Sequence, residues 1–382
     1  MERSVIFQEE HMIFRDALRG FLNKTVVDEY HKWEEAGIIP REIWKSFGQN
    51  GYLVPWAPEE YGGSGADFLY SVIITEELAR IGASSLLLSL HSDIVAPYIY
   101  SFGNEEQKKR WLIPSASGDA ILAVAMTEPD AGSDLASMKT KASKKGNKWV
   151  LNGQKTFISN GLLADIIVVA AKTGGPDTPP HQAMSLFVVE RDAPGFTRNG
   201  PIKKIGMKAQ DTAELFFDDC EIPEENLLGQ EGMGFLYLMQ KLQPERLVCA
   251  LGSQSAAERC LEITVEYVKE RKVFGKPLSR FQNTQFVLAE LATEIAIGRS
   301  FVDDLIRHHM AGKDVVKETC MAKYWVCEMG KNVADRCLQL FGGYGYCTEY
   351  LIARFYADAR VQTIYAGTSE IMKLIVSRSM GL

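Results

Sequence analysis

The spacing of hydrophobic residues changes twice along this chain, and the change limits how the chain can fold. Up to about residue 118, apolar residues recur at helical spacing. From about residue 119 to 230 they form short runs rich in β-branched and aromatic residues, separated by Gly, Asn and Pro. Helical spacing then returns and continues to the end. Helices and strands segregated in this way predict separately packed layers, because an alternating order would be needed for a parallel βαβ sheet.

The first and last blocks contain several helical segments. One apolar helix face near the start consists of Phe14, Ala17, Leu18, Phe21 and Leu22. Further helices are expected at 69–81, 233–270, 281–311, 315–341 and 350–360, with a last helix from about Ser369.

The middle block contains at least six runs with β character, at 120–127, 148–153, 155–159, 165–172, 184–190 and 213–222. The tripeptide Lys145-Gly146-Asn147 indicates a hairpin turn. Several short strands within one segment are typical of a β-sandwich or a β-barrel. We therefore predict an α+β multidomain protein, mainly α, with domains at 1–118, 119–230 and 231–382.

Composition and charge exclude several classes of protein. The net charge of -7 disfavours a nucleic-acid-binding surface. No apolar run approaches the roughly 20 residues of a membrane span. The first residues are acidic where a targeting signal would be basic, which is typical of a bacterial-type cytoplasmic protein, or of a mitochondrial-matrix protein whose presequence has been removed. The Gly cluster at 342–346 follows a helical segment, and this disfavours a nicotinamide dinucleotide fold.

Several cysteines, histidines and lysines do not by themselves indicate a functional site. None of the seven cysteines forms a CxxC pair, so we predict buried thiols and no metal site. We interpret the pair His308-His309 as a solvated helix face, and the lysines around residues 139–148 as a solvated hairpin. His91 lies in a helical segment that could line a pocket, and the sequence does not decide its role.

Five segments resemble motifs of one enzyme family. They are AMTEPDAGSD (125–134), KTFISNG (155–161), RKVFGKPLSRFQ (271–282), QLFGGYGY (339–346) and IYAGTSEIMK (364–373). Together, in this order, they resemble the acyl-CoA dehydrogenase family over essentially the whole chain. The sequences of the segments KAQDTAELFF (208–217) and MAKYW (321–325) are most similar to those of the long-chain type.

The resemblance implies a fold and an activity. The family has an N-terminal helical domain, a middle β domain and a C-terminal four-helix bundle, and its members are typically homotetramers, dimers of dimers, with one FAD per subunit. They remove a proton from Cα and a hydride from Cβ of an acyl-CoA, and they pass electrons to an electron-transferring flavoprotein. The expected product is a trans-2-enoyl-CoA, from fatty-acid β-oxidation or from branched-chain acyl degradation.

The position of the catalytic base departs from the pattern of most family members. Most of them carry a glutamate just before the Gly-Thr of the fifth motif, where this chain has Ala366. A minority, resembling the long-chain and isovaleryl types, carries the base before an Arg on the first long helix of the last domain. This chain has Glu245 followed by Arg246 at that place. The alternatives are that Glu245 is a solvated glutamate at a helix start, or that Glu370 is the base.

The resemblance also implies ligand contacts. The Ala366 N–H would donate to the thioester oxygen, where negative charge develops. Substrate contacts are expected from Ser133, Gln243, Pro244, Arg246, Ala366 and Gly367. FAD contacts are expected from Val124, Ala125, Met126, Thr127, Ser133, Phe157, Ile158, Ser159, Gln339, Leu340, Phe341, Gly342, Gly343, Thr368, Ser369 and Glu370, and, toward a neighbouring subunit's FAD, from Arg271 and Gln282.

Two other functions keep this fold. One is an acyl-CoA oxidase that uses O2, although such oxidases usually carry a large additional C-terminal region. The other is a non-catalytic assembly protein. The presence of Glu245 together with Ala366 argues against the second, because a protein without catalysis has no need to move the base.

Overall fold

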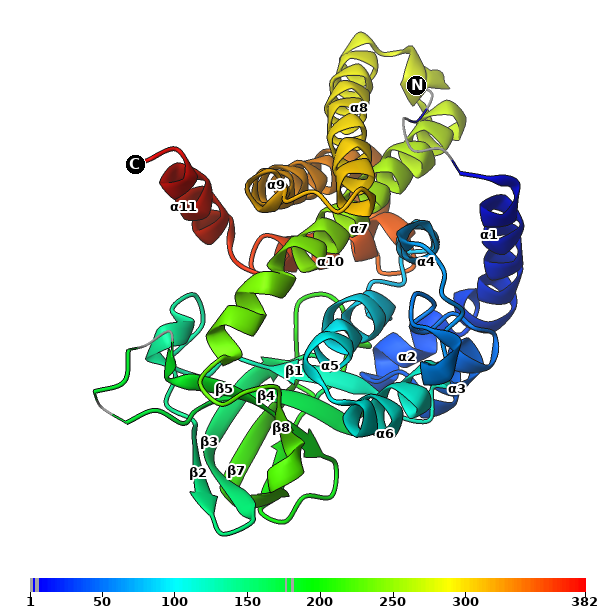
Figure 1. Cartoon of the computed structure of the whole chain (residues 1–382). Helices are drawn as coiled ribbons and strands as arrows, with labels where there is room; N and C mark the ends of the chain where they lie inside the picture. The colour runs from blue at the N-terminus through cyan, green and yellow to red at the C-terminus, as the bar shows by residue number, and fades with distance from the viewer. Residues whose placement is uncertain (1–2, 4–6, 176, 180–181) are drawn as a thin grey trace.

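Three blocks of secondary structure follow one another along the chain, helices first, then strands, then helices (Figure 1). The structure is a computed structural model that describes residues 3, 7–175, 177–179 and 182–382. The α+β, mainly helical architecture predicted from the hydrophobic spacing is confirmed. The division at residues 118 and 230 stays a prediction.

The first block consists of helices that pack beside one end of the sheet (Figure 1). Their ends follow local capping chemistry: the Asp67 side chain accepts from Leu69 N at 2.8 Å, and Asn104 and Gln107 form a reciprocal capping box. The elements are α1 (Glu9–Leu22), α2 (Tyr30–Ala36), α3 (Arg41–Gln49), α4 (Phe68–Arg80), η3 (Leu90–Val95), α5 (Ala96–Phe102) and α6 (Glu105–Ala116).

The middle block is a mixed sheet with the order β6-β7-β3-β2-β4-β5-β8, and β1 pairs with β4 in parallel. The strands are β1 (Leu122–Ala125), β2 (Lys141–Lys145), β3 (Lys148–Ile158), β4 (Ile166–Lys172), β5 (Met184–Glu190), β6 (Phe196–Asn199), β7 (Ala213–Pro223) and β8 (Leu227–Leu228). Strands β4 and β5 are buried along nearly their whole length, because one face packs on the helices and the other on the rest of the β domain.

One expectation about the strands was wrong, and some strands were not predicted. The runs 148–153 and 155–159 form the single strand β3, whose register with β7 shifts after Leu151 and again after Lys155, so the interruption is bulged rather than broken. Strand β2 was not predicted, because four of its five side chains are exposed and carry almost no hydrophobic signal.

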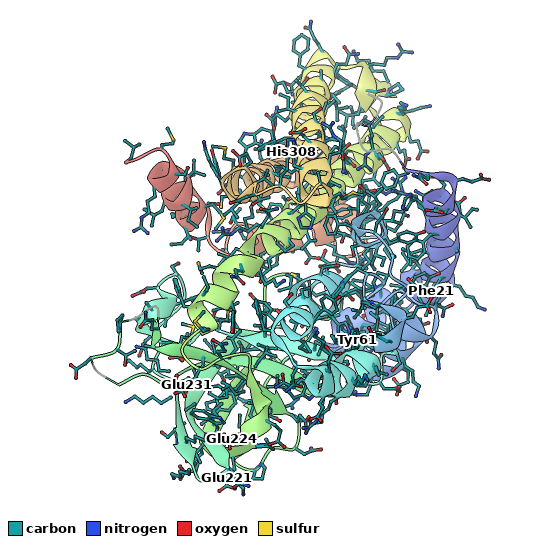
Figure 2. All side chains as sticks on the ribbon, in the orientation of Figure 1. Phe21, Tyr61, Glu221, Glu224, Glu231 and His308 are labelled. Carbon is teal, nitrogen blue, oxygen red and sulfur yellow. The ribbon has the colours of Figure 1, made fainter. Side chains whose placement is uncertain are left out.

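The predicted hairpin turn lies between β2 and β3, with Gly146 at a φ of +64°. Two of its exposed lysines also form surface ion pairs: Lys144 Nζ lies 2.5 Å from Glu224 and Lys148 Nζ 2.7 Å from Glu221. Both glutamates are labelled at the outer end of the β domain in Figure 2.

The last block is organised around α7 (Gly234–Glu270), which runs obliquely from the sheet to the far end of the molecule (Figure 1). Its 37 residues span roughly 55 Å. Helices α4, α8, α9 and α10 contact it along its length. The remaining helices are α8 (Gln282–Met310), α9 (Val316–Phe341), α10 (Leu351–Gln362) and α11 (Ser369–Ser379), and the hairpin β9 (Lys272–Val273) and β10 (Lys276–Pro277) links α7 to α8.

Candidate active site

Glu245 lies inside the fold and not at a solvated helix start. It is the twelfth residue of α7, and its exposed fraction is 5%. Pro244 precedes it within the helix, so the alternative of a solvated glutamate at a helix start was wrong. A carboxylate in this position loses most of its hydration, and this cost has to be offset by specific partners.

The Tyr98 hydroxyl is the closest such partner. It comes from α5, is fully buried, and donates to Glu245 Oε1 at 2.6 Å. Burial raises the pKa of Glu245 to about 7, while the Tyr98 hydrogen bond and the charges of Arg246 and Lys241 lower it. A base with a pKa near neutrality is well matched to proton abstraction at physiological pH. Nothing in the sequence pattern around Tyr98 distinguishes it from an ordinary core tyrosine.

The two neighbours of the Pro244-Glu245 pair behave differently. The Arg246 side chain is buried, donates from Nη1 to Cys320 Sγ at 3.0 Å, and leaves Nε without a partner among the described residues. Gln243 instead turns to the connection between α8 and α9, where its amide accepts from Val315 N and donates to Lys313 O. Arg246 therefore retains donor capacity near the base, whereas the Gln243 amide is already occupied.

Ala366 lies in the connection between α10 and α11 with an unusual backbone. Its φ is +50° and that of Gly367 is +88°. A left-handed conformation costs a non-glycine residue about 1–2 kcal/mol, so other contacts have to hold it. Within the described part of the chain, no acceptor takes the Ala366 N–H. A backbone donor that is held in place and unused is what a substrate oxygen requires.

The two β segments with expected flavin contacts lie side by side. Thr156 N donates to Thr127 O at 2.9 Å, and the buried Lys155 Nζ donates to Met126 O at 3.0 Å. Phe157 has a φ of +57° and an exposed fraction of 65%, so its ring lies on the surface of this region. The expected contact residues here are Val124, Ala125, Met126, Thr127, Ser133, Phe157, Ile158 and Ser159.

Two of these side chains cannot contact a ligand. Ala125 and Ile158 point into the core of the β domain. Only their backbone atoms remain available for binding, which the strand pattern could have indicated because alternate residues face opposite sides. Ser133, by contrast, is exposed.

A second group of expected residues lines a separate pocket of about 700 Å³. Its lining includes Arg271, the segment from Gln339 to Gly343, and the rings of Tyr267 and Tyr344. A Cβ placed on Gly342 or Gly343 would meet no atom within 4 Å, so these glycines form an open backbone cradle. Gln282 is exposed and does not line the pocket, although Asn283 and Thr284 do.

The start of α11 carries the remaining expected contacts. Thr368 caps the helix by accepting from Ile371 N at 3.3 Å, and the buried Ser369 donates to Glu328 at 2.9 Å. Glu370 is exposed, and local hydrogen bonds hold its pKa below the usual range. A solvated carboxylate with a lowered pKa is a weaker base than Glu245, so the geometry favours Glu245.

Two histidines considered from the sequence are structural. His91 is fully buried, and its ring contacts Ser115 O and Leu122 N, while burial lowers its pKa to about 4. His309 packs against Phe68 and Gln243, so the interpretation of the pair His308-His309 as a solvated face was wrong for His309. His308 is partly exposed on α8 and lies 3.5 Å from Asp304 (Figure 2). No cluster of three potential metal ligands occurs among the residues described.

Comparison with known proteins matches the three blocks in order. Residues 8–119 match the profile "Acyl-CoA dehydrogenase, N-terminal domain", 123–220 the middle domain and 232–381 the C-terminal domain. The chain belongs to the acyl-CoA dehydrogenase family. It is therefore an enzyme, an oxidoreductase and a flavoprotein of a family whose members act in fatty-acid metabolism and typically form tetramers.

Individual relatives cover nearly the whole chain. A solved acyl-CoA dehydrogenase from Geobacillus kaustophilus is 56% identical with a TM-score of 0.98, and both chains are covered completely (100%). The long-chain specific acyl-CoA dehydrogenase of Sus scrofa is 46% identical over 98% of this chain and 87% of that protein. The isovaleryl-CoA dehydrogenase of Pongo abelii is 36% identical over 97% and 88%. Among the described residues, no helix is both long and apolar enough to cross a membrane.

Proposed function

We propose that this chain is an FAD-dependent acyl-CoA dehydrogenase that converts a saturated acyl-CoA to the trans-2-enoyl-CoA, with Glu245 as the base. The observation that carries the proposal is the burial of the Glu245 carboxylate against Tyr98, with its pKa near 7. Because Ala366 occupies the place where most members carry the base, a second carboxylate has to serve this role.

The chain's own groups divide the chemistry between them. Glu245 takes the proton from Cα, and the electrons of that C–H bond move toward the thioester carbonyl. The free Ala366 N–H and the left-handed backbone around it provide a fixed donor for the oxygen, where enolate charge develops. When bound, FAD supplies the acceptor for the hydride that leaves Cβ.

The residues present fit FAD. Thr127 and Phe157 to Ser159 provide a surface where a flavin ring can pack, with the Phe157 side chain already exposed. Arg271 can pair bidentately with a phosphate, and Gly342 and Gly343 allow a close approach of the backbone to the adenosine diphosphate part. Thr368, Ser369 and Glu370 open α11, and a helix N-terminus suits an anionic or hydroxyl-rich group, although the Ser369 and Ile371 N–H groups already donate to Thr363 O and Thr368 Oγ1.

The distance between Glu245 and the pocket that contains Arg271 supports an oligomer. Tyr267, which lines the Arg271 pocket, lies twenty-two residues after Glu245 on the same helix, roughly 33 Å along its axis. One chain is therefore proposed to hold the flavin near Glu245 and to reach a neighbour's FAD with Arg271 and Gln282. The assembly we propose is a homotetramer formed as a dimer of dimers.

The substrate class is proposed from the position of the base and from the relatives. A base at the position of Glu245, and not at the position of Ala366, is typical of the long-chain and isovaleryl types. A long-chain and an isovaleryl-CoA dehydrogenase are both similar to this chain over nearly its full length. We propose a long-chain or branched acyl-CoA as substrate and an electron-transferring flavoprotein as electron acceptor.

Anaerobic titration of the purified flavoprotein with acyl-CoAs of graded length and branching tests this proposal. Bleaching of the long-wavelength flavin band by saturated acyl-CoAs is expected, strongest for a long or branched chain. A flavin that no acyl-CoA bleaches would instead indicate a non-catalytic protein. Steady hydrogen peroxide production with acyl-CoA in air would favour an oxidase.

A further inference from the structure

A second fully buried lysine, Lys323, holds the Ala366 loop. It is the eighth residue of α9, its exposed fraction is 0%, and among the described residues no carboxylate pairs with it. Its Nζ donates to Tyr365 O at 2.7 Å and to Gly367 O at 2.6 Å. A lysine has three donors and no acceptor, so burial without an acid is costly unless carbonyls replace water.

The two carbonyls are those on either side of Ala366. They lie in the connection from α10 to α11, which passes along α9 (Figure 1). Holding both of them restricts the backbone around Ala366, whose φ of +50° is otherwise unfavourable for a residue with a Cβ. The lysine therefore stabilises a loop conformation that the local sequence does not prefer.

The first of these hydrogen bonds also fixes the direction of the Ala366 donor. Tyr365 C=O and Ala366 N–H belong to one planar, trans peptide unit, so they point in opposite directions. Binding the carbonyl to Lys323 turns the N–H away from α9, and no described residue accepts it there. A hydrogen bond from a charged donor to the carbonyl also polarises the peptide and makes its N–H a stronger donor.

We infer that Lys323 is a positioning residue for the reaction, which aims and polarises the Ala366 N–H toward the thioester oxygen. The inference rests on the proposed function, in which that N–H binds the substrate carbonyl. Lys323 itself is assigned no contact with the substrate, since both of its hydrogen bonds are made to backbone carbonyls of the loop.

The test is an infrared measurement on Lys323→Met with a bound trans-2-enoyl-CoA labelled with 13C at the thioester carbonyl. In the wild type the carbonyl band is expected to move to lower wavenumber on binding, because the N–H polarises it. In Lys323→Met at least half of that shift should disappear. The kcat should fall roughly tenfold or more, with KM changed less than about threefold, because the interaction is strongest in the transition state.

Lys317→Met is the matched control, since Lys317 lies on the same helix and, within the described part of the chain, the hydrogen bonds to the Tyr365 and Gly367 carbonyls come from Lys323 and not from Lys317. It should keep the wild-type carbonyl shift and kcat. If Lys323→Met does not accumulate as a folded protein, Lys323→Gln is the deciding variant. The glutamine amide is neutral and shorter than lysine, so it can replace only part of the hydrogen bonding to the Tyr365 and Gly367 carbonyls. The carbonyl shift in this variant should therefore be intermediate. A folded Lys323→Met or Lys323→Gln protein with the full wild-type shift overturns the inference.

The failure of the proposed function would look different. In that case the wild type itself would show no carbonyl shift and no bleaching by saturated acyl-CoA. Wild-type bleaching and shift that persist unchanged in the lysine variants would contradict only the role of Lys323.

Discussion

The Tyr98 hydroxyl donates to Glu245 Oε1 at 2.6 Å, although 147 residues separate the two in the sequence. The bond joins α5 of the first block to α7 of the last and satisfies one oxygen of a buried carboxylate. It also lowers the pKa of that carboxylate against the larger effect of burial, which raises it. The pKa of Glu245 therefore stays close to neutral pH, so a useful fraction of the molecules carries the ionised base.

Tyr98→Phe removes this donor and should raise the pKa of Glu245 above about 7. A hydrogen bond to a charged group contributes about 1.5–3 kcal/mol, which corresponds to a shift of one to two pH units. Because Glu245 has to be ionised to accept a proton, the acidic limb of the kcat/KM profile should move to higher pH. An unchanged profile in Tyr98→Phe would show that the hydroxyl does not act on the base.

Asp93 should make stability depend on pH in the opposite sense to most acids. Burial raises its pKa to about 7, and only the Ser71 hydrogen bond opposes this. Between about pH 4 and pH 7 the folded state keeps a proton that the unfolded chain has released. The free energy of unfolding should therefore fall as pH rises through this window, by up to about 4 kcal/mol.

Asp93→Asn removes the ionisation and tests this directly. The Tm of the variant relative to the wild type should become more favourable by several degrees between pH 5.5 and pH 8.5. A Tm difference that is the same at both pH values would contradict the assignment of a raised pKa to Asp93.

Lys155 should be needed to hold together the two β segments with expected flavin contacts, because its Nζ donates to Met126 O and to Glu128. Burial lowers its pKa to about 8, while the Glu128 carboxylate at 2.8 Å raises it. Lys155→Met leaves Glu128 buried without its cation, so we expect a loss of about 3–5 kcal/mol in unfolding free energy and a lower FAD-to-protein ratio. Lys144→Met, which breaks the exposed pair with Glu224, is the control and should keep both the Tm and the flavin content.

Much of the fold follows from periodicity alone, because the three blocks differ in the spacing of their apolar residues. The limits of β3 and the existence of β2 could not be predicted in this way, because a bulge and an exposed strand leave no clear hydrophobic pattern. The base could be proposed only through the family resemblance. The partners Tyr98 and Lys323 could not be predicted, because each acts on a residue that is distant in sequence and looks like an ordinary core side chain.

Arg271 should affect FAD affinity and not the chemistry at Glu245. It lines the pocket with Gln339 to Gly343, at the C-terminal end of α7 and twenty-six residues after Glu245. Arg271→Glu should weaken FAD binding by tenfold or more, as expected for loss of a charged phosphate contact with reversal of charge. Lys269→Glu changes the charge equally two residues away and should bind FAD like the wild type. Equal FAD affinity in both variants would argue against a phosphate at this pocket.

The most direct test of the account is the rate of flavin reduction by a saturating long-chain acyl-CoA in Glu245→Gln, measured anaerobically by stopped flow. Glu266→Gln, an exposed position on the same helix, is the control. We predict that Glu245→Gln binds FAD and acyl-CoA but is reduced at least about a thousandfold more slowly, as expected for loss of a general base. Reduction of Glu245→Gln at the rate of the control would show that another group removes the proton.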